Sequence, residues 1–173
     1  IDRQEFMALS LTPDDDLLRL QVRAAPRAPE NIGLNVFDTP GYNAILSKHE
    51  EVLMSFLPQS DVIVFVVGHR TGFGQIDQDL LEAVDAATVH DREIPVLLVI
   101  NRAPVGASAT DKRVAEIVRL ATDGLHRTPR LQIVFSGSQM TADGKVVAGP
   151  LHADNVWAEV NRLAMDPLCL AVV

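Results

Sequence analysis

The clearest pattern along the chain is a series of short apolar runs separated by segments of helical periodicity. Val62–Val67 contains six apolar residues in a row, five of them β-branched, and Val96–Ile100 and Leu131–Phe135 are runs of the same kind. Runs of this type are typical of strands that are buried on both faces of a parallel sheet. We therefore predict three buried strands at these positions.

Helical periodicity fills the segments beside these strands. Helices are predicted over about Ala44–Leu57, with Pro58 as a stop, and over about Gln75–Thr88. A third helix follows Val96–Ile100, and a fourth has Asp154 as a candidate N-cap and Trp157 as a residue that packs onto the sheet. The inner faces are predicted to carry Leu46, Leu53, Phe56 and Leu57; Ile76, Leu80, Leu81, Val84 and Ala87; Val114, Ile117, Val118, Ala121 and Leu125; and Val156, Val160, Leu163 and Ala164.

The first part of the chain has a different pattern. Glu5–Leu11 and Leu17–Arg23 resemble the strands of a hairpin, and Ala24–Asn31 holds two prolines and is predicted to be a loop. Leu34–Phe37 is predicted to be a short strand, after which strand and helix alternate. We therefore predict one α/β domain over residues 1–173, with a hairpin and loop in residues 1–31. Residues 32–165 would form a doubly wound, mainly parallel sheet with flanking helices.

Composition narrows the classes of partner. The chain has 173 residues, 47% of them hydrophobic, and a net charge of -8, which favours a packed globular protein and disfavours a nucleic-acid partner. Cys169 is the single cysteine, so we expect no internal disulfide and a reducing compartment. No run approaches the ~18–20 apolar residues of a transmembrane helix. The chain begins in mid-pattern at Ile1, and we expect it to be a piece of a longer protein.

Ligands of doubly wound sheets bind at the carboxyl ends of the strands, so the residues just after each strand are the informative ones. Asp38-Thr39-Pro40-Gly41 follows the first predicted strand. An acidic residue there can hold a Mg²⁺-bound water, and a glycine three residues later lets its backbone N–H approach a terminal phosphate. His69-Arg70 follows the next strand, where Arg70 is a candidate contact for a phosphate or a partner.

This motif and its surroundings resemble the dynamin-like GTPases, within the translation-factor-related P-loop GTPases. The resemblance covers roughly Ile32–Phe135 and includes Asp38–Gly41, the lead-in Leu57-Pro58-Gln59-Ser60-Asp61 to the next strand, and Gly72–Asp79. It implies that Asp38 holds Mg²⁺ through water, that Gly41 senses the γ-phosphate, and that Thr39 begins the second switch.

The same resemblance assigns the base side of the nucleotide site. Asn101-Arg102-Ala103-Pro104 stands where such GTPases carry an Asn/Thr-Lys-x-Asp motif, and Ser136-Gly137-Ser138 stands where they carry a Ser-Ala motif. Asn101, Arg102 and Ser136 would therefore contact the nucleotide. Pro104 replaces the aspartate that accepts two hydrogen bonds from guanine, which weakens the expected guanine selectivity.

The resemblance implies GTP and Mg²⁺ as ligands, a homodimer across the nucleotide face, and a cytoplasmic protein peripheral to a membrane through other segments. The motif Gly-x-x-x-x-Gly-Lys-Ser/Thr, which cradles the phosphates, is absent from these 173 residues, and Tyr42 follows Gly41 where some relatives have a catalytic glutamine. We therefore assign no catalytic residue. Two alternatives stay open, a pseudo-GTPase that binds partners without hydrolysis and a fragment of a ParA/MinD-type ATPase.

Overall fold

The computed structural model describes residues 33–37, 54, 56–88, 94–104, 106–135, 138–140, 146–148 and 153–165. Strands and helices alternate through most of these ranges, as the sequence predicts. In chain order the elements are η3 (Leu57–Gln59), β1 (Ile63–Gly68), α3 (Gln75–Thr88), β2 (Val96–Ala103), α4 (Lys112–Leu125), β3 (Arg130–Phe135), β4 (Ser138–Met140), β5 (Val146–Ala148) and α5 (Ala153–Ala164).

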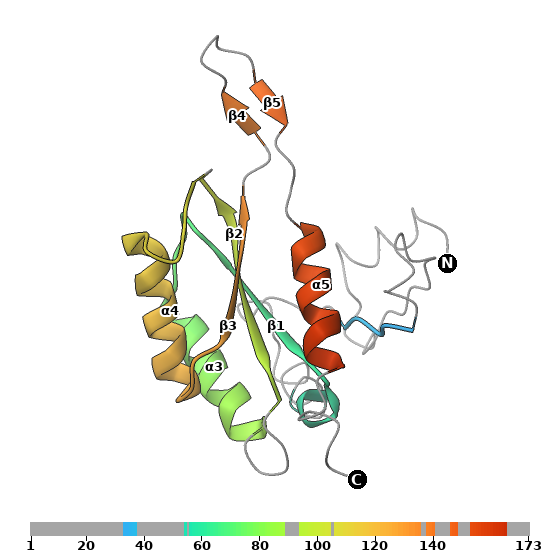
Figure 1. Cartoon of the computed structure of the whole chain (residues 1–173). Helices are drawn as coiled ribbons and strands as arrows, with labels where there is room; N and C mark the ends of the chain where they lie inside the picture. Colours follow the sequence, from blue (N-terminus) through green and yellow to red (C-terminus); the bar gives the residue numbers. More distant parts are fainter. Residues whose placement is uncertain are drawn as a thin grey trace, which may run out of the picture.

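The three strands β1, β2 and β3 form one parallel sheet with β2 in the middle. The register runs from Ile63 opposite Val96 to Gly68 opposite Asn101 on one side, and begins with Leu97 opposite Arg130 on the other. Figure 1 shows α3 and α4 on one face of this sheet and α5 on the other. The prediction of an α/β arrangement with a parallel sheet and flanking helices is therefore confirmed.

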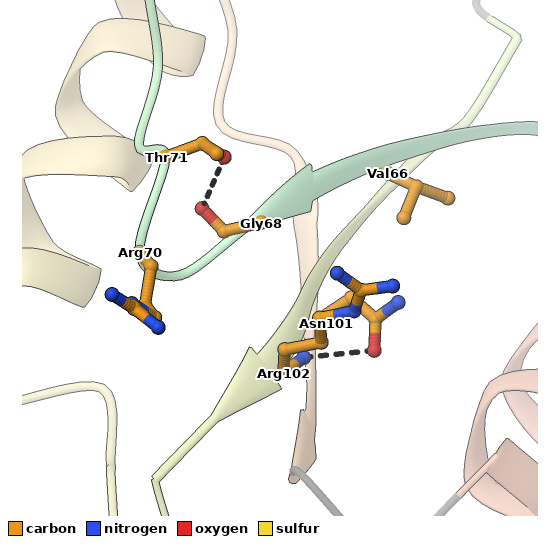
Figure 2. Close-up of a pocket in the computed structure, with 6 residues that line it drawn as sticks. All are labelled: Val66, Gly68, Arg70, Thr71, Asn101 and Arg102. Carbon is orange, nitrogen blue, oxygen red and sulfur yellow. Dashed lines mark hydrogen bonds between the residues drawn. The ribbon is translucent and has the colours of Figure 1, made fainter.

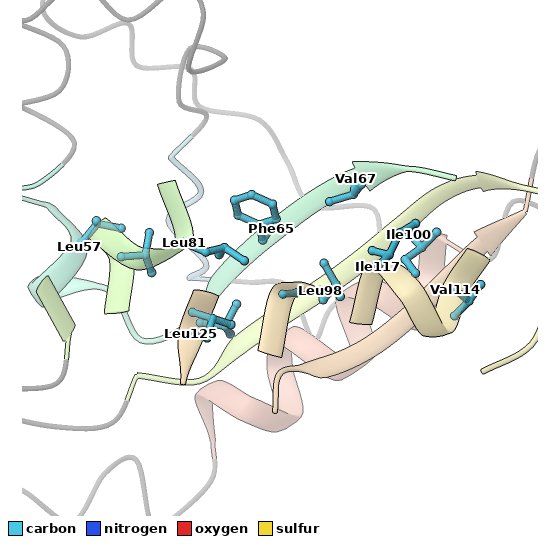
Figure 3. Packing of buried hydrophobic residues seen from close by; sticks show 12 residues of the cluster. Leu57, Phe65, Val67, Leu81, Leu98, Ile100, Val114, Ile117 and Leu125 are labelled. Carbon is cyan, nitrogen blue, oxygen red and sulfur yellow. The ribbon is translucent and has the colours of Figure 1, made fainter. Parts of the chain in front are cut away.

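Two apolar cores result from this layering, one on each face of the sheet. The larger core joins alternate residues of β1 and β2 to the inner sides of α3 and α4 (Figure 3), and Leu81, Val114 and Leu98 are almost fully buried within it. The smaller core joins Leu97 and Val99 of β2 to α5. Because β2 contributes to both cores, Val96–Ile100 is buried at every position, which explains its uninterrupted apolar sequence.

The predicted strand Leu34–Phe37 is wrong. Residues 34–37 form no strand in the structure, and the side chains of Val36 and Phe37 are 66% and 49% exposed. Phe37 stacks against Phe56 with 5.0 Å between the ring centroids. A strand requires a hydrogen-bonded neighbour, and none of the described strands pairs with this segment. The apolar pattern alone cannot supply that neighbour.

Three further details differ from the sequence prediction. The short antiparallel pair β4–β5 was not predicted. Ile76, expected on the inner face of α3, is 43% exposed, and Trp157, expected to pack α5 onto the sheet, is 38% exposed. α5 instead contacts the sheet through Val156, Val160 and Leu163, so Trp157 lies beside the buried stripe and not within it.

Some predicted elements fall outside the described residues. These are the hairpin Glu5–Leu11 with Leu17–Arg23, the loop Ala24–Asn31, and most of the helix Ala44–Leu57. Met54 and Phe56 are helical, and the chain then tightens into the 3₁₀ turn η3, which has proline in its first turn. The predicted end of that helix near Pro58 is thus confirmed.

The longest described helices, α3 and α4, have 14 residues each. Among the residues described, no helix combines the length and apolarity needed to cross a bilayer. The cellular compartment stays a prediction.

A polar cluster joins the end of α3 to the end of α4. Asp85 is buried and pairs with Arg127 at 2.5 Å and with Nδ1 of His126 at 3.1 Å. Arg127 also donates to the Thr88 hydroxyl at 3.3 Å and to the Ile94 carbonyl at 3.2 Å. These bonds tie both helices to the residue that leads into β2.

We predict that Asp85→Ala destabilises the chain by about 2–4 kcal/mol, because it removes the buried carboxylate that pairs with the mostly buried Arg127 guanidinium and accepts from His126. Asp123→Ala is the matched control, since the Arg119–Asp123 pair is 63% and 53% exposed and should contribute less than about 1 kcal/mol. Urea unfolding followed by circular dichroism measures both. Equal losses of stability for the two variants would show that the cluster does not hold the helices.

Candidate functional site

A pocket of ≈ 630 Å³ lies at the carboxyl ends of β1 and β2. Figure 2 shows its lining: Val66 and Gly68 from β1, Arg70 and Thr71 from the loop that follows, and Asn101 and Arg102 from the end of β2. Adjacent parallel strands end at the same edge of a sheet, so the sequence segments that follow them meet there. This is the edge at which α/β sheets bind their ligands.

The end of β2 is irregular. The pairing of β2 with β3 shifts register between Ile100 and Ala103, and Arg102 adopts a left-handed backbone conformation with φ 55°. The Asn101 side-chain oxygen accepts a hydrogen bond from the Arg102 backbone N–H at 2.8 Å, which supports this conformation. Left-handed backbone at a residue other than glycine is strained, and such strain concentrates at functional sites.

The loop after β1 is held by hydrogen bonds to the end of β2 and within its own turn. The His69 backbone N–H donates to the Asn101 carbonyl at 2.8 Å, which extends the contact between the two strands by one residue. The Thr71 hydroxyl and the Gly72 backbone N–H both donate to the Gly68 carbonyl, at 3.1 and 2.8 Å. The resulting turn places the exposed side chain of Arg70 at the pocket.

Arg113 of α4 fixes this loop from the side. Its guanidinium donates to the backbone carbonyls of His69 and Thr71 at 3.5 and 3.4 Å, and it pairs with Glu116 at 2.9 Å. The guanidinium passes directly over Gly72, where an added Cβ would lie 2.1 Å from it. Gly72 also has φ +72°, so the backbone conformation favours glycine, and a Cβ at this position would displace the flexible Arg113 guanidinium.

Asp111 starts α4 next to the same loop. Its side chain accepts hydrogen bonds from the backbone N–H groups of Arg113 and Val114, at 2.8 and 3.3 Å. The bonds from Val114 and then Arg113 are the main reason that the pKa of Asp111 is lowered, with a smaller contribution from His69, whose Nε2 lies 3.8 Å away. The N-cap of α4 thereby sits against the turn that carries Arg70.

The free charged groups of the pocket are hydrogen-bond donors. Within the described part of the chain, the guanidinium groups of Arg70 and Arg102 form no hydrogen bond or ion pair, whereas Asn101 Oδ1 is already engaged. Pro104, which directly follows β2, has no side-chain acceptor. No group of three or more His, Cys, Asp or Glu side chains in the described ranges is placed to hold a metal ion.

The predicted site residues divide into two sets. Asn101 and Arg102 line the pocket, and Arg70, singled out by its position after a buried strand, lines it with them. Asp38, Thr39, Gly41 and Ser136 lie outside the described residues, so their predicted roles stay predictions. Thr71 and Val66 were not singled out, although both could have been found from their position at or near the end of β1.

No protein-family model, no curated protein and no solved structure matches this chain. The pocket and the sequence motifs are therefore the basis for assigning a function.

We predict that Gly72→Ala destabilises the chain more than Gly106→Ala does. Gly106 also has a positive φ, +89°, but its added Cβ would meet nothing within 4 Å, so this variant isolates the backbone strain at about 1 kcal/mol. At Gly72 the added Cβ would also displace the flexible Arg113 guanidinium and weaken its bonds to the loop carbonyls, which should add about 0.5–1 kcal/mol. A double-mutant cycle with Arg113→Ala checks the cause, because without the guanidinium the two glycine variants should cost the same. If the difference in stability between the two glycine variants stays the same in the Arg113→Ala protein, the contact with Arg113 is not its cause.

We predict that the stabilisation by Asp111 depends on pH. Because its folded-state pKa lies below the ordinary value of 3.8, the charged form stabilises the fold at pH values above 3.8 and loses this effect as the pH falls through the lowered pKa. The difference in urea midpoint between the parent and Asp111→Ala should therefore shrink in acid. Asp111→Asn caps the helix without titrating, so its difference from Asp111→Ala should stay constant. Parallel pH profiles of parent and Asp111→Asn would contradict the prediction.

Proposed function

We propose that this chain forms part of a GTPase-type nucleotide-binding domain and binds a nucleotide at the carboxyl ends of β1 and β2. One observation carries the proposal: Asn101 and Arg102, two of the residues that the resemblance to GTPases assigns to the nucleotide, line a pocket at the expected edge of a parallel sheet. A motif alone is weak support, and a pocket alone is equally weak. Their coincidence at one place supports nucleotide binding.

The described geometry favours weak selection between bases. Guanine presents N–H donors that need an acceptor, and the Asn101 side-chain oxygen is bonded to the Arg102 backbone N–H. Pro104 provides no other acceptor. A site without a carboxylate that accepts two hydrogen bonds from guanine discriminates poorly between purines that differ in their donors. The proposed site therefore takes purine nucleotides with little preference for GTP over ATP.

Hydrolysis is a separate question from binding. The 173-residue sequence lacks the lysine-containing loop that cradles the β- and γ-phosphates. Asp38 is the expected position for a water-mediated Mg²⁺, and it lies outside the described residues. The proposal therefore assigns binding to this chain and assigns no hydrolytic step to it, which is also the behaviour of the pseudo-GTPase alternative.

We predict that the 173-residue chain binds GTP and ATP with similar affinity and more weakly than the micromolar range, because the phosphate cradle is missing. The measurement is an NMR titration of the ¹⁵N-labelled chain with each nucleotide in the presence of Mg²⁺. Amide shifts should concentrate at residues 68–72 and 101–103. Pro104→Asp adds the absent acceptor and should favour GTP over ATP by about tenfold.

Two controls accompany this titration. Tripolyphosphate has the phosphate chain of GTP without its nucleoside, so GTP should bind more tightly than tripolyphosphate. Asp123→Ala, on the exposed side of α4, should leave the shifts unchanged. Shifts remote from the ends of β1 and β2, or a GTP affinity equal to that of tripolyphosphate, would overturn the proposed function.

A further inference from the structure

Two arginines line the pocket without any counter-charge among the described residues. The guanidinium groups of Arg70 and Arg102 carry five N–H donors each, and neither forms a bond to the described protein. Four of the five other described arginines form ion pairs with carboxylates, namely Arg113, Arg119, Arg127 and Arg162. The chain has a net charge of -8, so two arginines without counter-charges make this pocket a locally positive site on an acidic protein.

The backbone conformation of Arg102 is the second unusual feature of this pocket; the other described non-glycine residue with positive φ, His126, is the C-cap of α4. Glycine would occupy φ 55° without strain, yet the chain has arginine at this position. The conformation is fixed by the register shift at the end of β2 and by the bond from its backbone N–H to Asn101. Strain of this kind persists where the surrounding structure enforces it, and it is a feature of ligand-binding positions.

The positions of the two side chains limit the shape of the ligand. Figure 2 shows Arg70 on the loop that follows β1 and Arg102 beside Asn101 at the end of β2, so the two arginines reach the pocket from different segments. A ligand that reaches both needs oxygen acceptors at two places. The Asn101 amide nitrogen and the apolar side chain of Val66 complete the lining near Arg102.

We propose that this pocket is an oxyanion site in which Arg70 and Arg102 bind an extended polyphosphate group from two sides. The proposal deepens the proposed function. It rests on that function where it takes the polyphosphate to be the phosphate chain of the bound nucleotide. The same chemistry is present in free inorganic polyphosphate. Planar guanidinium groups suit phosphate oxygens because each can donate two parallel hydrogen bonds.

Other ligand classes fit these groups less well. A cation would face two positive charges, and no described carboxylate lines the pocket to offset them. The negative net charge of the chain disfavours unspecific attraction of polyanions, so any such binding has to arise from local contacts.

Isothermal titration of the full chain with inorganic pyrophosphate and tripolyphosphate tests the proposal. Arg70→Ala removes one guanidinium, and the loss of its charge-assisted hydrogen bonds should weaken tripolyphosphate binding by about tenfold or more. Arg102→Gly removes the other guanidinium and relieves the left-handed strain. It should weaken binding to a similar extent while its urea midpoint stays at or above that of the parent.

Arg119→Ala is the matched control, because it removes the same charge from an exposed position on α4. It should leave the affinity unchanged. Orthophosphate should bind more weakly than pyrophosphate, since it has fewer oxygen acceptors and less charge for the two arginines. An equal loss of affinity with Arg119→Ala, full affinity in Arg70→Ala or in Arg102→Gly, or no anion binding by the parent would each overturn the oxyanion site.

The outcomes separate this inference from the proposed function. If GTP and tripolyphosphate bind equally and both depend on the two arginines, the oxyanion site stands and nucleotide binding fails. If GTP binds at residues 68–72 and 101–103 but is insensitive to Arg70→Ala and Arg102→Gly, nucleotide binding stands and the oxyanion site fails. Arginine-dependent binding of both ligands, with GTP the tighter, supports both and identifies the polyphosphate as part of the nucleotide.

Discussion

The burial of β2 between two parallel strands and two helical layers is the constraint on which the described structure depends. Every residue from Val96 to Ile100 is buried, so this stretch admits no polar side chain. Asn101 is the first position at which burial decreases, and it is also the first polar residue of the strand. The candidate site therefore lies at the carboxyl end of β2 because that is where the packing of β2 first allows polar chemistry.

The helices α3 and α4 fix the two ends of this sheet by different means. At the amino end of β2, the buried pair Asp85–Arg127 connects both helices to the Ile94 carbonyl. At the carboxyl end, Arg113 of α4 reaches across Gly72 to the carbonyls of the loop after β1. The first contact holds the helical layer to the sheet, and the second positions the loop that carries Arg70. Structural stability and the shape of the pocket thus depend on different residues of one layer.

The parts of the fold that could be predicted are those in which burial determines composition. Val96–Ile100 was identified because a strand buried on both faces has to be apolar throughout. Val62–Val67 forms the predicted strand, but the prediction that it is buried on both faces is wrong, because Val64 and Val66 are exposed. Leu34–Phe37 failed because a strand also needs a neighbour, which no local pattern encodes. The pocket was predictable to the extent that strand ends were known, which located Asn101 and Arg70. The left-handed conformation of Arg102 could not be predicted, since it arises from a register shift between β2 and β3, and arginine has no preference for it.

The outer edge of β1 lies next to the pocket, so a strand added at this edge would extend the sheet and also bring residues to the candidate site. Among the described strands, β1 pairs with β2 alone, and its residues Val64 and Val66 are 41% and 58% exposed although they alternate with buried neighbours. A further strand that paired in parallel with this edge would end beside Gly68, next to the pocket. The loop after that strand would then face Arg70 and Arg102. Any segment that satisfies the free edge of β1 would therefore also add residues to the candidate site, so stability and ligand binding are expected to rise together.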